Sequence, residues 1–313
     1  MSVTVVGSIA FDAVKTPFGA RERMLGGAAT HFALAASFLA DVRVVGPVGE
    51  DFGDPDLAVL ATRGTDIDAV ERIAGGRTFF WKGEYGWDLN SRQTLATDLN
   101  VFEHFHPKLS AAARHSEVLF LANIQPQLQL DVLEQCNGTR FVALDSMDLW
   151  IQIARDDLLK VIGRVDCVIL NDGELRQLTK RPNLLAAARE VLGLGPSVVV
   201  AKQGEYGAAL VTAESFFALP AYPLETVIDP TGAGDTFAGG FVGYLARHLE
   251  EAHTDQRLRQ AMAYGTALAS FNVEEFGTER VTRLTSYEIN MRVADLRRMT
   301  HFEHDPIAVT TSG

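Results

Sequence analysis

The sequence predicts an α/β protein in which helices cover both faces of a mostly parallel sheet. Six short runs rich in valine, leucine and isoleucine have the composition of strands that are buried on both faces. These runs lie at 3–7, 42–48, 118–123, 140–145, 166–170 and 198–202. Helical segments separate them, and strand–helix alternation of this kind is typical of parallel strands joined by crossover helices.

The connecting segments and the second half of the chain complete this prediction. Helices rich in alanine and leucine are predicted at 29–40, 110–116 and 183–192. Turn residues separate three shorter apolar runs, which indicates hairpins at one side of the sheet, at 208–213, 215–220 and 225–229. From 233 to about 298 the chain is predicted to be largely helical, and residues 304–313 are expected to fray.

One segment, residues 77–102, interrupts the alternation. Five of its aromatic residues lie close together and follow no helical period; they are Phe79, Phe80, Trp81, Tyr85 and Trp87. We expect short antiparallel strands in a small β-lid, built from about 10–22 and 73–102 and inserted in a single domain that spans 1–313. Exposed aromatic side chains in a compact protein usually cover something, so the segment predicts a lid over a ligand or a homodimer contact. An ordinary hairpin packed on the core is the alternative.

Composition excludes several classes of protein. Lys and Arg number 28 against 40 Asp and Glu, a net charge of −12, which argues against non-specific binding to nucleic acid or anionic membranes. No run approaches about 18 uninterrupted apolar residues, and the N-terminus lacks the basic region of a signal peptide. Cys136 and Cys167 have no CxxC spacing, so we expect reduced thiols in a cytoplasmic protein without nucleic-acid or membrane partners.

A glycine-rich string, DPTGAGDTFAGG at 229–240, runs directly into a predicted helix. Small residues let successive backbone N–H groups converge, and the helix N-terminus adds its positive dipole end, so Gly232, Ala233 and Gly234 are expected to form an anion hole. Asp235 lies in the first helical turn, where the dipole favours its ionised form. A carboxylate there can accept a proton from a hydroxyl during phosphoryl transfer. The competing interpretation is that Asp235 only caps the helix.

The whole string resembles the second signature of the ribokinase family, the PfkB carbohydrate kinases. LGGAATHFALAASFLA at 25–40 is similar to the first signature, and the resemblance extends along nearly the whole chain. It implies a ribokinase-like three-layer α/β/α sandwich and an ATP-dependent kinase that phosphorylates a hydroxyl of a sugar or a nucleoside. A Walker A loop and a dinucleotide-binding fingerprint are both absent from the sequence. A non-catalytic sensor that kept the kinase fold is the alternative, but it predicts decay of the base or the anion hole.

The resemblance also assigns residues to the acceptor. Asp12, after the first strand, would bond acceptor hydroxyls, while Gly26 and Gly27 allow its close approach. His31 stands where the family often has asparagine, and a histidine cannot reproduce a carboxamide's paired donor and acceptor, which leaves the acceptor's identity open. The aromatic lid offers faces on which a nucleobase can stack, which favours nucleosides. A basic fringe flanks this side and is interpreted as solvated; it comprises Arg21, Arg23, Arg77, Lys82 and Arg92.

On the nucleotide side, the resemblance implies ATP and Mg²⁺ as cofactors. Asn171 and Glu174 match an N-x-x-E motif whose glutamate organises Mg²⁺ through water. Lys202, Gly204 and Gly207 would lie near the phosphates or the ribose. Gly265, Ala267 and Ser270 are expected beside the adenine. Asp229 matches a position that often responds to a monovalent cation, which leaves K⁺ open as a further cofactor.

Overall fold

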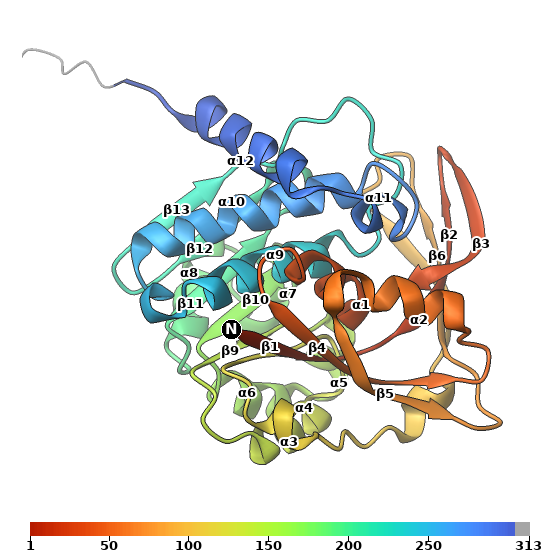
Figure 1. Ribbon diagram of the computed structural model, residues 1–313. Coiled ribbons are helices and arrows are strands. Elements are labelled where there is room, and N and C mark those ends of the chain that lie inside the picture. The colour runs from red at the N-terminus through yellow and green to blue at the C-terminus, as the bar shows by residue number, and fades with distance from the viewer. Residues whose placement is uncertain (304–313) are drawn as a thin grey trace, which may run out of the picture.

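The protein is built around two sheets, as the computed structural model of residues 1–303 shows (Figure 1). Residues 304–313, for which fraying was expected, lie outside the described residues. The larger sheet has nine strands in the order β13-β12-β11-β10-β9-β8-β1-β4-β5. Their bounds are β1 Ser2–Val6, β4 Asp41–Gly49, β5 Asp66–Ile73, β8 Val118–Leu121, β9 Phe141–Leu144, β10 Cys167–Asn171, β11 Val198–Lys202, β12 Ala208–Val211 and β13 Phe216–Leu219.

All six predicted buried strands are present, and they pair in parallel with their neighbours in the sheet. At one edge β12 runs antiparallel to β11 and to β13, with which it forms the predicted hairpin. Two local predictions were incomplete or wrong. The edge strand β5 was missed because its sequence, DIDAVERI, carries charges expected of a loop, and residues 225–229, predicted as a strand, form an irregular segment.

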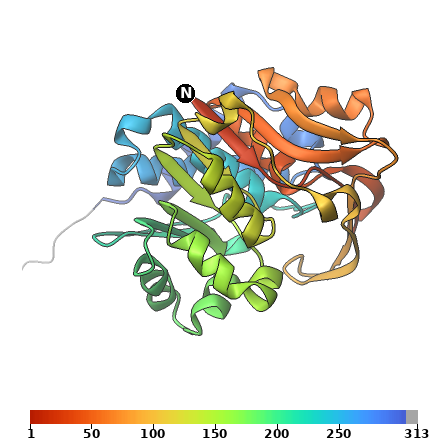
Figure 2. The same cartoon turned by 90° about the horizontal axis from the view of Figure 1, so that it is seen from below.

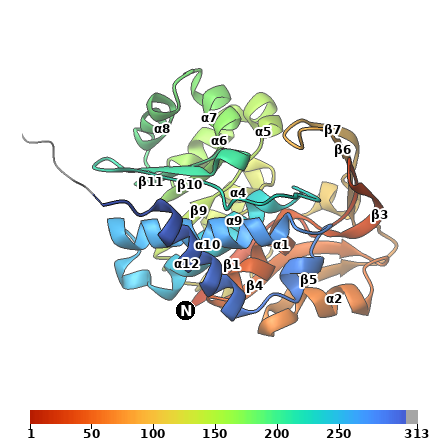
Figure 3. The ribbon, with the colours of Figure 1, turned by 90° about the horizontal axis from the view of Figure 1, so that it is seen from above.

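Helices cover both faces of the large sheet, which confirms the three-layer α/β/α sandwich. Alternate residues of one strand enter different cores: Val3 and Val5 pack beneath one helical layer, and Val6 packs beneath the other. The first layer is α1, α9 and α10, with α12 outside it (Figure 3). The second layer is seen from below in Figure 2 and contains α3, α4, α6, α7 and α8.

The helices have the following bounds: α1 Ala28–Ala36, α2 Asp54–Leu60, α3 Ala111–Arg114, α4 Pro126–Gln135, α5 Asp148–Ile153, α6 Arg155–Ile162, α7 Asp172–Thr179, α8 Leu184–Leu192, α9 Ala233–Arg247, α10 Asp255–Asn272, α11 Glu279–Thr282 and α12 Ser286–Thr300. Among residues 1–303, no helix has the length and hydropathy needed to cross a bilayer.

The second sheet has four strands and stands beside the main one (Figure 1). Its order is β3-β2-β6-β7, with bounds β2 Ala10–Thr16, β3 Gly19–Gly26, β6 Phe79–Tyr85 and β7 Arg92–Asp98. The β2–β3 and β6–β7 hairpins are antiparallel, as predicted, but β2 and β6 pair in parallel. The pairing between the two hairpins was not predicted, because they come from separate parts of the chain, where no short turn sets their direction.

Candidate active site

The candidate site lies at the carboxyl ends of the parallel strands, where the small sheet meets the loop before α9. Asp229 fixes this loop from a fully buried position. Its Oδ1 accepts the N–H of Thr231 at 2.9 Å, and its Oδ2 accepts the N–H of Gly277 at 3.0 Å. The carboxylate predicted to respond to a monovalent cation therefore also ties two loops together.

The N-terminus of α9 has the geometry expected of an anion hole. Gly232 is the N-cap with a left-handed φ of 73°, and a Cβ there would lie 2.4 Å from ring atoms of His31. Ala233, Gly234 and Asp235 form the first helical turn, whose backbone N–H groups have no partners within the helix; that of Ala233 donates to the Pro230 carbonyl at 3.2 Å. The loop therefore requires glycine at position 232 for both its backbone conformation and its packing.

Asp235 lies in this turn beside two cationic side chains. Burial raises the pKa of its carboxyl group, while the charges of Lys202 and Arg92 and its own backbone N–H oppose the rise. The sequence predicted the opposite direction from the helix dipole alone. Desolvation outweighs the dipole here, a cost that no local sequence pattern reveals.

The structure brings Asp12 and the two glycines of the first signature together. Asp12 is 5% exposed, and a Cβ on Gly26 would lie 2.0 Å from its Oδ2, so position 26 requires glycine. Gly27, with a φ of 95°, leads from β3 into α1. Burial, together with the charges of Asp229 and Asp235, raises the pKa of Asp12 to about 8. Asp12 and Asp235 thus face the same small volume.

His31 supports the anion hole from beneath. It is 2% exposed, and its Nδ1 lies 3.1 Å from Oδ1 of Asn272. The amide nitrogen of Asn272 donates to the Thr231 carbonyl at 2.7 Å, so the Oδ1 is the acceptor and His31 Nδ1 carries the proton. Burial lowers the pKa of His31, which keeps the ring neutral. The prediction placed His31 against the acceptor; in the structure its ring packs under Gly232, and its partner Asn272 was missed.

The nucleotide side is built at the ends of β9, β10 and β11. Asn171 and Glu174 form a capping box at the start of α7, each side chain bonding the other's backbone N–H at 2.8 Å. Lys202 Nζ lies 2.7 Å from Oδ2 of Asp145, which is 3% exposed. Asp145 was missed, although it is the last residue of the run predicted as a strand at 140–145. Burial raises the pKa of Asp145 to about 6 and that of Glu174 to about 7, against the opposing charge of Lys202.

The glycines after β11 shape a tight turn. Gly204 and Gly207 both have positive φ, at 58° and 96°. A Cβ on Gly207 would lie 2.1 Å from the Leu219 carbonyl oxygen, so this glycine lets the turn pass close to β13. Glu205, in the same turn, accepts a hydrogen bond of 2.9 Å from Asn90, which lies in the turn between β6 and β7.

The small sheet therefore contacts both halves of the site. Tyr85, at the end of β6, is buried, and its hydroxyl accepts a hydrogen bond of 3.2 Å from Thr231. Arg92 pairs with Tyr85 across the hairpin, and its charge acts on Asp235. Arg92, one of the predicted basic fringe, therefore also acts electrostatically on the site. Arg21 and Arg23 of the same fringe stack on Phe276 and Phe11, respectively.

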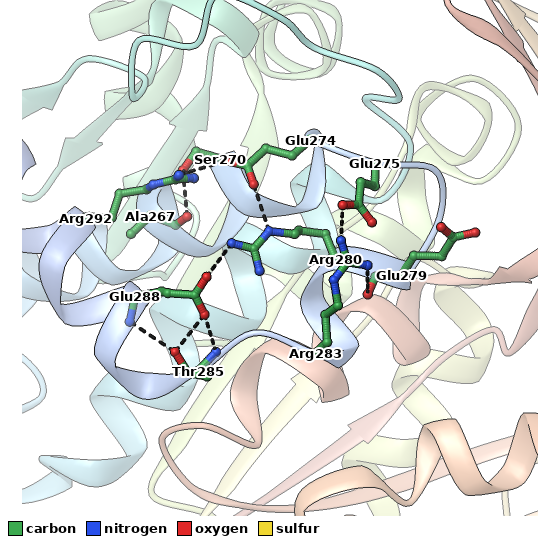
Figure 4. Close-up of polar contacts among 10 residues, drawn as sticks. All are labelled: Ala267, Ser270, Glu274, Glu275, Glu279, Arg280, Arg283, Thr285, Glu288 and Arg292. Atoms are coloured by element: carbon green, nitrogen blue, oxygen red, sulfur yellow. Dashed lines mark hydrogen bonds and ion pairs between the residues drawn. The ribbon is translucent and has the colours of Figure 1, made fainter.

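The three residues predicted beside adenine lie in the packing of α10. Gly265 lets α10 approach α9, since a Cβ there would lie 2.8 Å from the Phe237 carbonyl oxygen, and Ala267 is fully buried. The Ser270 hydroxyl donates to the Ala267 carbonyl at 2.7 Å and accepts from Arg292 at 3.0 Å (Figure 4). Arg292 also pairs with Glu274, so Ser270 belongs to an ion-pair network that joins α10 to α12. Contacts of Gly265, Ala267 and Ser270 with adenine stay a prediction, in addition to these packing roles.

Comparison with known proteins identifies the family. The model of the pfkB family carbohydrate kinases matches residues 2–283. The chain belongs to this family. A cytidine kinase from Thermococcus kodakarensis is 34% identical over 261 residues, covering 80% of this chain and 91% of that protein. These similarities support an ATP-dependent carbohydrate or nucleoside kinase, and nothing in them supports the alternative of a non-catalytic sensor.

Solved structures share the fold. The nucleoside kinase of Methanocaldococcus jannaschii, an archaeal member of the ribokinase family, has a TM-score of 0.77 at 22% identity and covers 94% of this chain and 98% of its own. A structure from E. coli in complex with ATP and Mg²⁺ has a TM-score of 0.75 at 21% identity and covers 94% and 99% of the two chains. The ribokinase-like fold is therefore confirmed.

Two alanine substitutions in the anion hole are expected to separate folding from chemistry. Gly232→Ala places a methyl group against the His31 ring in a left-handed conformation that costs about 1–2 kcal/mol, so both Tm and kcat should fall. In Gly234→Ala the methyl meets only the end of a flexible side chain, Lys202 Nζ at 3.1 Å. Its Tm should hold or rise, while displacement of the ammonium lowers kcat roughly 10- to 100-fold. Thermal melts and initial rates on both variants check this; equal losses of Tm would contradict it.

Proposed function

We propose that this kinase transfers the γ-phosphoryl group of ATP to a hydroxyl of a nucleoside. The observation that carries the proposal is the position of Asp235 in the first turn of α9, next to Gly234, on which a Cβ would lie 3.1 Å from Lys202 Nζ. The charge of Asp235 also acts on Asp12, so the proposed base lies near both the acceptor carboxylate and the phosphate cation. The cytidine kinase and nucleoside kinase among its relatives favour a nucleoside over a free sugar.

In the proposed reaction, the Asp235 carboxylate accepts the proton of the acceptor hydroxyl. The hydroxyl oxygen attacks the γ-phosphorus, its new P–O bond forms as the bond to the β–γ bridging oxygen breaks, and ADP leaves with the bridging oxygen. The N–H groups of residues 232–235 and the Lys202 ammonium stabilise the charge on the transferred group. Asp12 orients the acceptor through a hydroxyl.

The carboxylates on the nucleotide side suit Mg²⁺ bound with ATP. Burial, and to a smaller extent neighbouring carboxylates, raises the pKa of Asp145 and Glu174 despite the charge of Lys202, and an added cation would favour their ionised forms. Among residues 1–303, no three His, Cys, Asp or Glu side chains are arranged to hold a metal ion by themselves. Phosphate oxygens and water would supply most ligands, with Glu174 as the protein's contact through water.

Three further parts of the proposal have separate tests. K⁺ beside Asp229 predicts faster turnover in potassium chloride than in tetramethylammonium chloride at equal ionic strength.

A homodimer formed through the small sheet predicts a doubled mass in light scattering, and this doubling should be lost when charges are placed on that sheet. Free Cys136 and Cys167 and the need for ATP suit a cytoplasmic location, which fractionation of the source cells tests.

An ATP-consumption screen tests the nucleoside assignment. The acceptors are cytidine, the other nucleosides, ribose, fructose, inositols and keto-deoxy acids, each at equal concentration with Mg²⁺. We expect at least one nucleoside to give a kcat/KM more than tenfold above every sugar. Turnover of a sugar alone would overturn the nucleoside assignment and leave the kinase chemistry intact.

The small sheet is expected to move when the acceptor binds, because it contacts both the anion-hole loop and the turn at 204–206. Trp81 is partly buried in β6, and Trp87, 92% exposed, stands in the adjoining turn. Closure should change their fluorescence, and Trp87→Phe separates the two signals. Unchanged emission at saturating acceptor, in an enzyme shown to turn over, would contradict closure.

A further inference from the structure

Asp145 holds the end of the Lys202 side chain in a defined place. Asp145 directly follows β9, and Lys202 is the last residue of β11; the two strands lie on either side of β10. Oδ2 of Asp145 and Nζ of Lys202 lie 2.7 Å apart. The side chain of Asp145 is 4% exposed and that of Lys202 is 17% exposed. Asp145 is itself fixed, because its Oδ1 accepts the N–H of Ser146 at 2.8 Å and its carbonyl accepts the Gln129 amide at 3.1 Å.

The pairing leaves Lys202 turned toward the anion hole. A Cβ on Gly234 would lie 3.1 Å from the ammonium nitrogen, so the ammonium lies beside the first turn of α9. An ammonium group has three donors, and Asp145 takes one of them. The other two remain for phosphate oxygens at the place where the helix N–H groups converge.

A lysine on a flexible four-carbon chain would not keep this position unaided. The charges of Glu174 and Asp235 also act on Lys202. Released from Asp145, the ammonium would turn toward one of these carboxylates. Pairing with Asp235 would occupy the proposed base and withdraw the cation from the phosphate in one movement.

We propose that Asp145 is a positioning residue, which holds the Lys202 ammonium at the N-terminus of α9 so that it meets the transferred phosphoryl group. The inference rests on the proposed function, in that it takes the anion hole to receive the γ-phosphate. It gives Asp145, which the signature motifs do not include and which so far entered only as a negative charge near Mg²⁺, a specific contact and a specific role.

Whether nucleotide affinity falls or rises in an Asp145 variant separates a positioning role from a purely electrostatic effect. Asp145→Asn removes a negative charge near the triphosphate, so a bystander carboxylate would, when neutralised, leave nucleotide affinity unchanged or improved. If Asp145 positions Lys202, the substitution should instead weaken nucleotide binding. We expect the Kd of a non-hydrolysable ATP analogue with Mg²⁺, measured by calorimetry, to rise about tenfold, and kcat to fall, while the acceptor KM stays within twofold.

Asp148→Asn is the matched control. Asp148 lies three residues further along the chain, at the start of α5, and is exposed; its charge acts on Glu174, but its side chain accepts from Leu149 rather than from Lys202. It should bind the analogue as tightly as the wild type or more tightly. If Asp145→Asn proves unstable in thermal melts, Asp145→Ser gives the same comparison with a smaller side chain.

A double-mutant cycle shows whether Asp145 acts through Lys202. Lys202→Met should itself raise the Kd, and adding Asp145→Asn should then cost less than twofold more. Additive losses, or an Asp145→Asn enzyme that binds the analogue as well as Asp148→Asn does, would overturn the proposal. Wild-type affinity and turnover test the proposed function, and the differences between variants test Asp145, so the two can fail separately.

Discussion

Asp235→Asn is expected to lower kcat about 10²- to 10⁴-fold while nucleotide and acceptor still bind. The amide keeps the volume of the carboxylate, and Asp235 does not cap the helix with its side chain, because the N-cap is Gly232. Removing a carboxyl whose pKa is raised by burial also removes a desolvation cost, so Tm should not fall. What is lost is the group that takes the acceptor's proton.

Rates measured with one good acceptor, beside calorimetric Kd values for the ATP analogue, check this prediction. Asp41→Asn is the control, since the side chain of Asp41 is 92% exposed and lies at the start of β4, away from the strands' carboxyl ends. It should match the wild type in rate. A kcat for Asp235→Asn above about a tenth of the wild-type value would contradict a role as general base. Asp229→Asn is unsuitable as a control, because both oxygens of Asp229 accept backbone N–H groups.

Much of the fold could be predicted because its signals are local. Strands buried on both faces appear in the sequence as continuous apolar runs, and all six such runs are strands of the large sheet. β5 lies at the edge of that sheet, where charged side chains reach solvent, so its sequence resembles a loop. The parallel pairing of β2 with β6 depends on contacts between distant segments, which no short stretch encodes.

In the candidate site, too, some features follow from the local sequence and others depend on the assembled fold. The conformation of Gly232 follows from the glycine-rich string itself, and its left-handed φ is what such a string predicts. The pairing of Asp145 with Lys202 joins residues on two strands separated by a third, so it becomes visible only once the sheet is assembled. The contact between Arg292 of α12 and the Ser270 hydroxyl is likewise invisible in the sequence, because it joins two helices that meet only in the folded protein.

Asp12→Asn is expected to make the ligand-free enzyme more stable and at the same time a poorer binder of its acceptor. Asp12 is buried beside Asp229 and Asp235, and its pKa of about 8 means that the folded protein keeps a proton that the unfolded chain loses near pH 4. The folded state binds more protons throughout that interval, so the free energy of unfolding of the wild type decreases as pH rises from about 4 to 8. Asparagine has no proton to lose, so the variant escapes this decrease.

The measurable result is a difference in Tm between variant and wild type that grows from pH 5 to pH 8 and then levels off. At pH 8 the gain in unfolding free energy should be about 2–4 kcal/mol, a Tm increase of several degrees. Above pH 8, where the Asp12 carboxyl is ionised, the same variant should raise the acceptor KM roughly 10- to 150-fold, because a hydrogen bond to a charged group is lost, and leave the ATP KM nearly unchanged. Asp41→Asn should show neither effect. A Tm difference independent of pH would mean that Asp12 titrates normally, and a larger rise in the ATP KM than in the acceptor KM would place Asp12 outside the acceptor site.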